Sequence, residues 1–215
     1  MKVHCLQGRT ASGFVTFGGV WEKGEVSAAS FLLTTPDGKP LPLQSKPMAF
    51  WPDGSIKWSA HTTDAALMKE GAELLPTPKE QPDSGIQIIK GSDACTLDTG
   101  VLRLTVPLGE NLRCDFLAQD ISVSGRKAAH KVYPVFLLER RNETEDVLET
   151  RVQKFHGAIQ KAVLEEAGPL QATIAFYGEN TPGECCSMPF VIRLSVWKGS
   201  AEMHFVHTFL FDGAE

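Results

Sequence analysis

The stretch with the clearest binding chemistry is FWPDGSIKW, at residues 50–58. It contains two tryptophans, Trp51 and Trp58, and Lys57 directly precedes the second. An indole can stack on the flat face of a ligand, and an ammonium group can pair with an acidic one. The stretch is therefore either a ligand-binding surface or a well-formed turn flanked by structural tryptophans.

The local chemistry of this stretch predicts a tight turn. Pro52 holds its own φ at about −65°, which suits the second position of a type I turn. Asp53 suits the third position, and Gly54 can adopt the positive φ that begins a bulged hairpin. We therefore expect a hairpin between strands at 48–51 and 55–61. The same Pro-Asp-Gly sequence within TPDGK at 35–39 predicts a second hairpin.

Simple alternation after the turn assigns the two tryptophans different roles. Ile56, Trp58 and Ala60 share one face of the expected strand, so Trp58 is predicted to lie in the core. Trp51 ends the preceding strand beside the turn. Its indole either covers the mouth of a small barrel or stays exposed for stacking on a ligand.

The remaining reactive side chains do not form a recognisable catalytic or metal-binding pattern. The five cysteines are an odd number spread over a long chain, which is typical of free thiols. His204 and His207 are predicted to lie on opposite faces of one strand, so they cannot share a metal ion on one face. Tyr133 and Tyr177 lie within apolar strand patterns and are expected to be sheet residues. We therefore predict no catalytic residue, no metal ion and no cofactor.

Charge and hydropathy exclude two classes of partner. The net charge of −5 and the scattered Lys and Arg residues provide no basic surface for nucleic acid. No apolar run approaches the ~20 residues of a membrane-spanning helix, and the polar start of the chain lacks the apolar stretch of a secretory signal. The expected location is the cytoplasm, or the periplasm or exterior if a leader has been removed.

The chain has the pattern of an all-β protein. Short runs rich in Val, Ile, Leu, Phe and Thr alternate with turn signals, and several of them place apolar and polar residues in alternation. Local chemistry leaves residues 158–168 undecided between helix and strand. The expected strands are 13–17, 30–35, 48–51, 55–61, 85–90, 100–106, 120–125, 131–139, 170–178, 189–197 and 202–211.

A composition change divides the chain in two. Residues 67–85 hold three prolines and several charges without strand periodicity, so they are predicted to form a linker or long loop. We expect a small β-barrel domain at 1–75, a linker at 76–84 and a β-sandwich domain at 85–215.

Several segments in combination resemble one protein family. GGVWEKGEV at 18–26 and TTPDGKPLPLQSKPMAFWPDGSIKWSAH at 34–61 resemble the amino-terminal β-barrel of exo-acting rhamnogalacturonan lyases, a polysaccharide lyase family. EEAGPLQATIAFYG at 165–178 and the segment at 189–213 are similar to that family's central β-sandwich. The resemblance covers nearly the whole chain and depends on the combined order of the segments.

The resemblance implies a fold and a separation between structural and catalytic domains. It implies a RIFT-barrel-like domain followed by an antiparallel sandwich that is incomplete here, and it makes 158–178 a hairpin. In the family an α/α-toroid carries most of the active site, so no catalytic residue is transferred to this chain. The implied partners are an acidic polysaccharide or oligosaccharide and the remaining domains of a longer chain.

Three functions remain open at this point. The chain is a non-catalytic front segment that supports or borders the substrate cleft of a pectin lyase, a free-standing carbohydrate-binding module, or an assembly module that uses its strand edges. In the module hypothesis, Trp21, Trp51, Trp58 or Trp197 would stack on sugar. The residues expected to contact substrate are Trp51, Trp21, Lys57 and His61.

Overall fold

The computed structural model confirms the all-β fold class. In the residues that it describes, the only helix is a short 3₁₀ turn. The chain divides into two compact units, which are described separately: unit 1 holds residues 1–86 and 168–171, and unit 2 holds the rest. The described residues are 1–4, 13–27, 30–68, 71–77, 85–144, 147–180 and 188–210.

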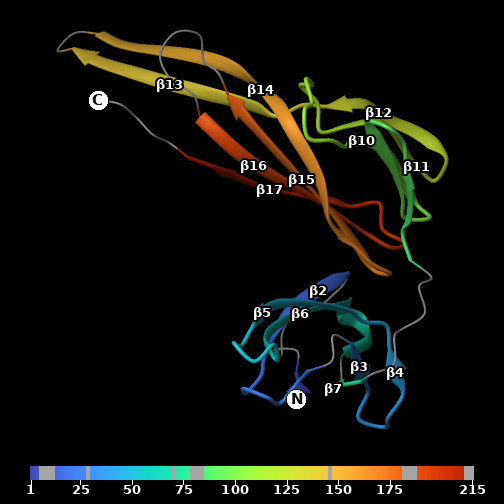
Figure 1. Cartoon of the computed structure of the whole chain (residues 1–215). Helices are drawn as coiled ribbons and strands as arrows, with labels where there is room; N and C mark the ends of the chain where they lie inside the picture. The colour runs from blue at the N-terminus through green and yellow to red at the C-terminus, as the bar shows by residue number, and fades with distance from the viewer. Residues whose placement is uncertain are drawn as a thin grey trace. The chain divides into compact units, whose positions relative to one another are not determined.

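Unit 1 consists of two antiparallel sheets (Figure 1), with strand orders β1-β7-β3-β4 and β2-β6-β5. Its elements are β1 (Lys2–Val3), β2 (Phe14–Val20), β3 (Phe31–Thr34), β4 (Pro40–Leu41), β5 (Gln44–Phe50), β6 (Ile56–Asp64), the 3₁₀ helix η1 (Ala65–Met68) and β7 (Ala72–Pro76). Both sheets contribute to one apolar core, made of Trp21, Val26, Phe31, Leu33, Leu41, Leu43, Ile56, Met68, Ala72 and Leu74.

Both predicted Pro-Asp-Gly turns are present. Gly38 and Gly54 have φ values of 84° and 85°, the left-handed region that glycine adopts without a steric penalty. The first turn connects β3 to β4, which pair at Leu33 and Leu41. The second connects β5 to β6.

The expectation of a structureless stretch at 67–85 is wrong at its start. Ala72 and Leu74 of β7 are buried, and Glu73 between them is exposed. This is the alternation of a half-buried strand, and β7 lies between β1 and β3 in the sheet. Pro76, the first of the three prolines that indicated a linker, is the last residue of β7 and pairs with Phe31. Residues 78–84 of the linker expected at 76–84 lie outside the described part of the chain.

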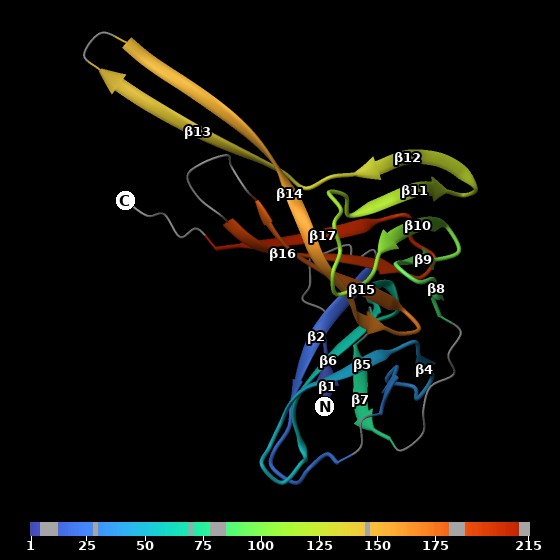
Figure 2. The ribbon, with the colours of Figure 1, turned by 45° about the horizontal axis from the view of Figure 1, so that its top comes forward.

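Unit 2 consists of two five-stranded antiparallel meanders (Figures 1 and 2). The first runs through β8 (Gln87–Lys90), β9 (Ala94–Asp98), β10 (Leu102–Pro107), β11 (Ala118–Val123) and β12 (Arg126–Val132). The second runs through β13 (Val135–Thr144), β14 (Val147–Ala167), β15 (Gln171–Asn180), β16 (Met188–Trp197) and β17 (Met203–Phe209). Alternate residues of β10 and β16 are buried, so each meander turns one apolar face inward.

The undecided segment at 158–168 is strand, as the resemblance implied. It belongs to β14, which pairs with β15 across the turn at Gly168–Leu170. The register shifts between Ile159 and Lys161 and again between Leu164 and Glu166. Each bulge inserts one residue and resets the alternation of faces. Two resets within one strand explain why the sequence showed no clean period of two.

The strand expected at 131–139 is interrupted. Lys131 and Val132 end β12, and Val135 begins β13. Pro134 lies between them. Because proline has no backbone N–H to donate to a ladder, the chain leaves one sheet and enters the other at this residue.

Candidate functional site

The turn between β5 and β6 is fixed by a set of short hydrogen bonds. The Trp51 N–H donates to the Ser55 carbonyl at 2.8 Å, and the Gly54 N–H donates to the Trp51 carbonyl at 2.9 Å. The Asp53 carboxylate accepts the Ser55 N–H at 3.0 Å and the Ser55 hydroxyl at 2.6 Å. These bonds from Ser55 hold the pKa of Asp53 below its usual value. The turn therefore presents the residues around it in a defined geometry.

Removal of this carboxylate is expected to weaken unit 1. Asp53→Ala leaves the Ser55 N–H and hydroxyl without their acceptor, so the free energy of unfolding should fall. Urea unfolding followed by far-UV circular dichroism measures this loss. Asp53→Asn retains an acceptor oxygen at the same position and should lose less. Equal stability of Asp53→Ala and the unmodified chain would contradict the assigned role.

Trp51 is held on two sides. Its Nε1 donates to the Trp21 carbonyl at 3.2 Å, and the Lys57 Nζ lies 4.5 Å from the centre of its ring. The side chain is partly buried, whereas Lys57 is exposed. A cation over an indole face is attracted by the ring quadrupole. Lys57 therefore lies over the ring beside the turn, where its exposed ammonium can also meet an acidic ligand.

Trp58 does not lie in the core, which corrects the sequence prediction. Its side chain is 51% exposed, on the outer face of the β2-β6-β5 sheet. Trp58 pairs with Ala49 and Ile56 pairs with Phe50, so β6 carries one extra residue, Lys57. This bulge shifts the alternation by one position. Ile56 stays inside, while Lys57 and Trp58 are both exposed.

Small residues surround the exposed indole. Directly across from Trp58 are Val20 of β2 and Ala49 of β5, and the next row on the same face begins with Gly18 opposite Ala60. A Cβ added at Gly18 would meet no atom within 4 Å, so the surface beside the ring is open. We call these five residues the tryptophan platform. A low, apolar surface around one indole matches the apolar face of a sugar ring.

Further apolar side chains are exposed on the same strands. Val20 is 68% exposed, and Met48 and Phe50 of β5 are 56% and 59% exposed. Large apolar side chains that are exposed on a folded domain are candidates for ligand contact. Lys57, next to Trp58 in the sequence, provides a positive charge, which favours an acidic ligand over a neutral one.

Trp21 and His61, two of the expected substrate contacts, lie inside unit 1. Trp21 is 4% exposed, stacks on Phe31 and donates its Nε1 proton to the Ser59 hydroxyl at 2.7 Å. His61 is fully buried, with the Ser45 Oγ 2.8 Å from Nδ1 and the Ser59 Oγ 2.7 Å from Nε2. Burial lowers the pKa of His61 to about 4, so the ring is neutral at pH 7. Both side chains are therefore closed off from solvent within unit 1.

The structure thus brings together a different set from the one expected. Trp51 and Lys57 lie beside the turn as anticipated, and Trp58 joins them in place of Trp21 and His61. The sequence offered one usable signal for this change. Ser59 is the acceptor that the buried Trp21 Nε1 needs, and placing Ser59 inside forces its neighbour Trp58 outside.

Other candidates for chemistry are dispersed. Tyr177 donates to Glu165, whose carboxylate is also bound by Arg193, and Tyr133 is exposed between β12 and β13. Among the described residues, no group of three His, Cys, Asp or Glu side chains could hold a metal ion. The same residues include no helix that is long and apolar enough to span a membrane.

Comparison with protein families assigns both units. The model of the PcRGLX-like N-terminal RIFT barrel domain matches residues 1–75, and the model of the PcRGLX-like protein central beta sandwich domain matches residues 86–215. The chain belongs to the PcRGLX-like family. This confirms the resemblance to exo-acting rhamnogalacturonan lyases, and it identifies unit 1 with a RIFT barrel and unit 2 with a sandwich.

A longer bacterial protein is similar to this chain. The chain is 31% identical over 220 residues to the uncharacterized protein YetA of Bacillus subtilis (strain 168). The similarity covers 98% of the PcRGLX-like chain and 25% of YetA. The chain therefore spans about a quarter of the length of this relative.

Proposed function

We propose that this chain forms the non-catalytic amino-terminal β-domains of a pectin-degrading polysaccharide lyase of the rhamnogalacturonan exolyase type. The observation that carries the proposal is the match of a RIFT barrel and a central sandwich, in that order, to domains of the PcRGLX-like family. In this role the two units scaffold or border a carbohydrate cleft, and an α/α-toroid elsewhere in the longer protein performs the elimination.

The tryptophan platform supports a direct contact with the polysaccharide. The Trp58 ring is exposed next to Gly18 and Ala60, so a sugar ring can approach it without displacing a side chain. Stacking buries apolar C–H groups of the sugar against the indole. Lys57, next to Trp58 in the bulge, can pair with the carboxylate of a neighbouring uronic acid residue.

Truncation of Trp58 tests this contact. We expect Trp58→Ala to weaken binding of rhamnogalacturonan oligosaccharides by about tenfold, equivalent to ~1.4 kcal/mol, because the stacking surface is removed. Isothermal titration calorimetry of the full 215-residue chain measures the change. Trp58→Phe keeps a smaller ring and should retain most of the affinity.

A matched control separates stacking from general loss of aromatic surface. Tyr133 is also exposed but lies in unit 2, so Tyr133→Ala should leave binding at the platform unchanged. An unaltered far-UV spectrum of Trp58→Ala confirms that the fold persists. If neither this variant nor the unmodified chain binds any pectic oligosaccharide, direct contact with sugar is refuted and the scaffolding role alone remains.

A further inference from the structure

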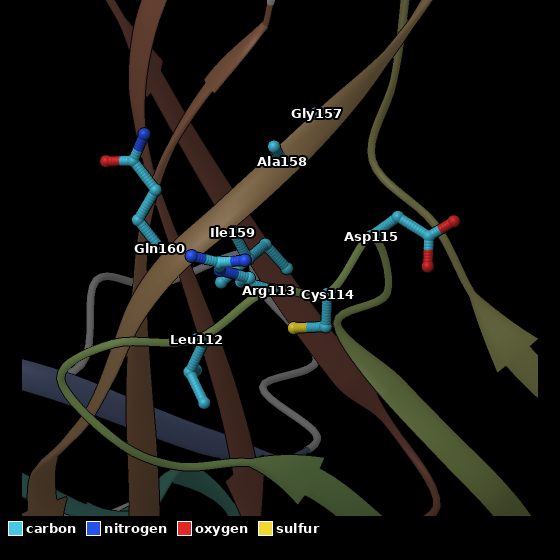
Figure 3. A pocket seen from close by; sticks show the side chains of 8 residues that line it. All are labelled: Leu112, Arg113, Cys114, Asp115, Gly157, Ala158, Ile159 and Gln160. Atoms are coloured by element: carbon cyan, nitrogen blue, oxygen red, sulfur yellow. The ribbon is translucent and has the colours of Figure 1, made fainter.

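Unit 2 contains a groove that the function proposed above does not use (Figure 3). The connection between β10 and β11 runs alongside β14 and pairs with it as a strand does. The Leu112 N–H donates to the Gln160 carbonyl at 2.7 Å, and the Ile159 N–H donates to the Cys114 carbonyl at 2.7 Å. The resulting groove has a volume of about 560 Å³ and is lined by Leu112, Arg113, Cys114, Asp115, Gly157, Ala158, Ile159 and Gln160.

The volume of the groove and the small side chain on its β14 wall indicate a small ligand with an apolar face. Its volume lies within the range of roughly 300–1,000 Å³ that is typical of small-molecule sites. Ala158 is exposed and has only a methyl group, so this part of the wall is low and accessible. A pyranose ring presents a C–H face that can lie against such a surface.

Arg113 supplies the charge preference of the groove. Its side chain is exposed and makes no ion pair within the part of the chain that the structure describes. In Figure 3 the Arg113 guanidinium projects toward the Gln160 side, and the Asp115 carboxylate projects toward the opposite side. The nearest acid in the sequence therefore does not neutralise it. A planar guanidinium without a partner is suited to bidentate pairing with a carboxylate.

The exposed residues of β14 form the groove wall, and Gly157 faces the interior of unit 2. A Cβ at Gly157 would lie 2.7 Å from the Phe190 Cε1 and 2.9 Å from the Asn180 Oδ1, so no side chain fits at this position. Ala158 and Gln160 are exposed, whereas Gly157 and Ile159 are buried. A ligand in the groove would therefore meet the side chains of Ala158 and Gln160.

We propose that this groove binds a uronate residue of the polysaccharide, with its carboxylate paired to Arg113. The requirement for a carboxylate follows from the unpaired guanidinium, and the choice of a sugar rests on the proposed function. The Gln160 amide lies on the same side as the guanidinium and can bond a ring hydroxyl, while the sugar's C–H face lies against Ala158.

Titration of the full chain with digalacturonate tests the proposal. Backbone amide resonances of Arg113, Cys114, Ala158 and Gln160 should shift in ¹⁵N-resolved NMR spectra, and the methyl-esterified disaccharide should not shift them. Arg113→Ala should weaken binding at these resonances at least tenfold, and Arg113→Lys should weaken it less. Arg126→Ala removes an exposed arginine of β12 outside the groove and should change nothing.

The outcomes separate this proposal from the proposed function. Shifts confined to Trp58 and its neighbours, with the groove resonances unmoved, would overturn the uronate site and leave the function standing. Equal binding by Arg113→Ala and the unmodified chain would also overturn it. Absence of any shift with digalacturonate, while rhamnogalacturonan oligosaccharides still bind, would refute the groove alone. Absence of both would refute the groove and the sugar contact at Trp58, and would leave the scaffolding role.

Discussion

Lowering the pH from 7 to 4 is expected to reduce the free energy of unfolding of unit 1 by roughly 3 kcal/mol, with His61 as the responsible group. The ring is fully buried and lies against Phe17 and Phe31, with centroid distances of 5.3 and 4.7 Å. Charging an imidazole in this apolar surrounding is unfavourable, and this burial lowers its pKa to about 4.

The sign and the pH window follow from the two pKa values of His61. The unfolded chain takes up its proton near pH 6.5 and the folded chain only near pH 4. Between these values the unfolded state binds more protons, so stability falls as the pH falls. Above this window the contribution is complete. Asp37 and Asp53 have pKa values lowered by hydrogen bonds, so their contributions are lost only below pH 3.8.

Urea unfolding of the full chain at a series of pH values measures the effect. The amide resonances of β6 are followed because they report on unit 1 alone. This matters because burial also lowers the pKa of His207 in unit 2. His61→Gln removes the titration and should flatten the profile between pH 6.5 and 4. The Cε1 resonance of His61 in the unmodified chain gives a second test. Titration of that resonance near pH 6.5 would contradict the assignment.

The sequence predicted the strands well where alternation was regular. The residues at 189–197 alternate without interruption, and β16 has the corresponding buried and exposed pattern. The Pro-Asp-Gly turns were equally clear because each residue has its own backbone requirement. The fold class follows from these local signals, since every strand pairs with a neighbour of the same regular type.

Bulges account for most of what the sequence did not predict. A bulge depends on the register between two strands, and no single strand encodes that register locally. Lys57 in β6 moves Trp58 to the surface, and the two shifts in β14 hide its strand period. The candidate site therefore depends on pairing partners far away in the sequence. Residue type alone identified the tryptophans but not which of them is exposed.

The buried residues of unit 1 are a second case in which the sequence did not reveal the role of a side chain. Trp21 and His61 have side chains that commonly bind ligands, and composition alone could not separate that role from a structural one. Their roles depend on Ser45 and Ser59, which satisfy the polar atoms inside unit 1. Once those bonds form, moving either ring to the surface would leave buried hydroxyls unpaired.

Gly178→Ala is expected to destabilise unit 2 by about 3 kcal/mol, because β14 and β15 approach too closely at this position for any side chain. A Cβ on Gly178 would lie 2.2 Å from the Ala158 carbonyl oxygen and 2.6 Å from the Phe190 Cζ. The phenyl ring could move, but the carbonyl belongs to the paired backbone of β14. The strands would therefore have to separate next to the bulge that lies between Ile159 and Lys161.

This close approach also bears on the groove, because Ala158 is both the residue that Gly178 abuts and part of the groove lining. Thermal unfolding of Gly178→Ala measures the stability loss, and the amide resonances of 157–160 report the displacement of β14. Gly18→Ala is the matched control, since its added Cβ meets nothing within 4 Å and should change stability by less than about 1 kcal/mol. Equal effects of the two substitutions would show that strand separation at Gly178 does not limit stability. A large effect at Gly178 alone, with shifted resonances at 157–160, would establish that glycine at this position sets the geometry of the groove wall.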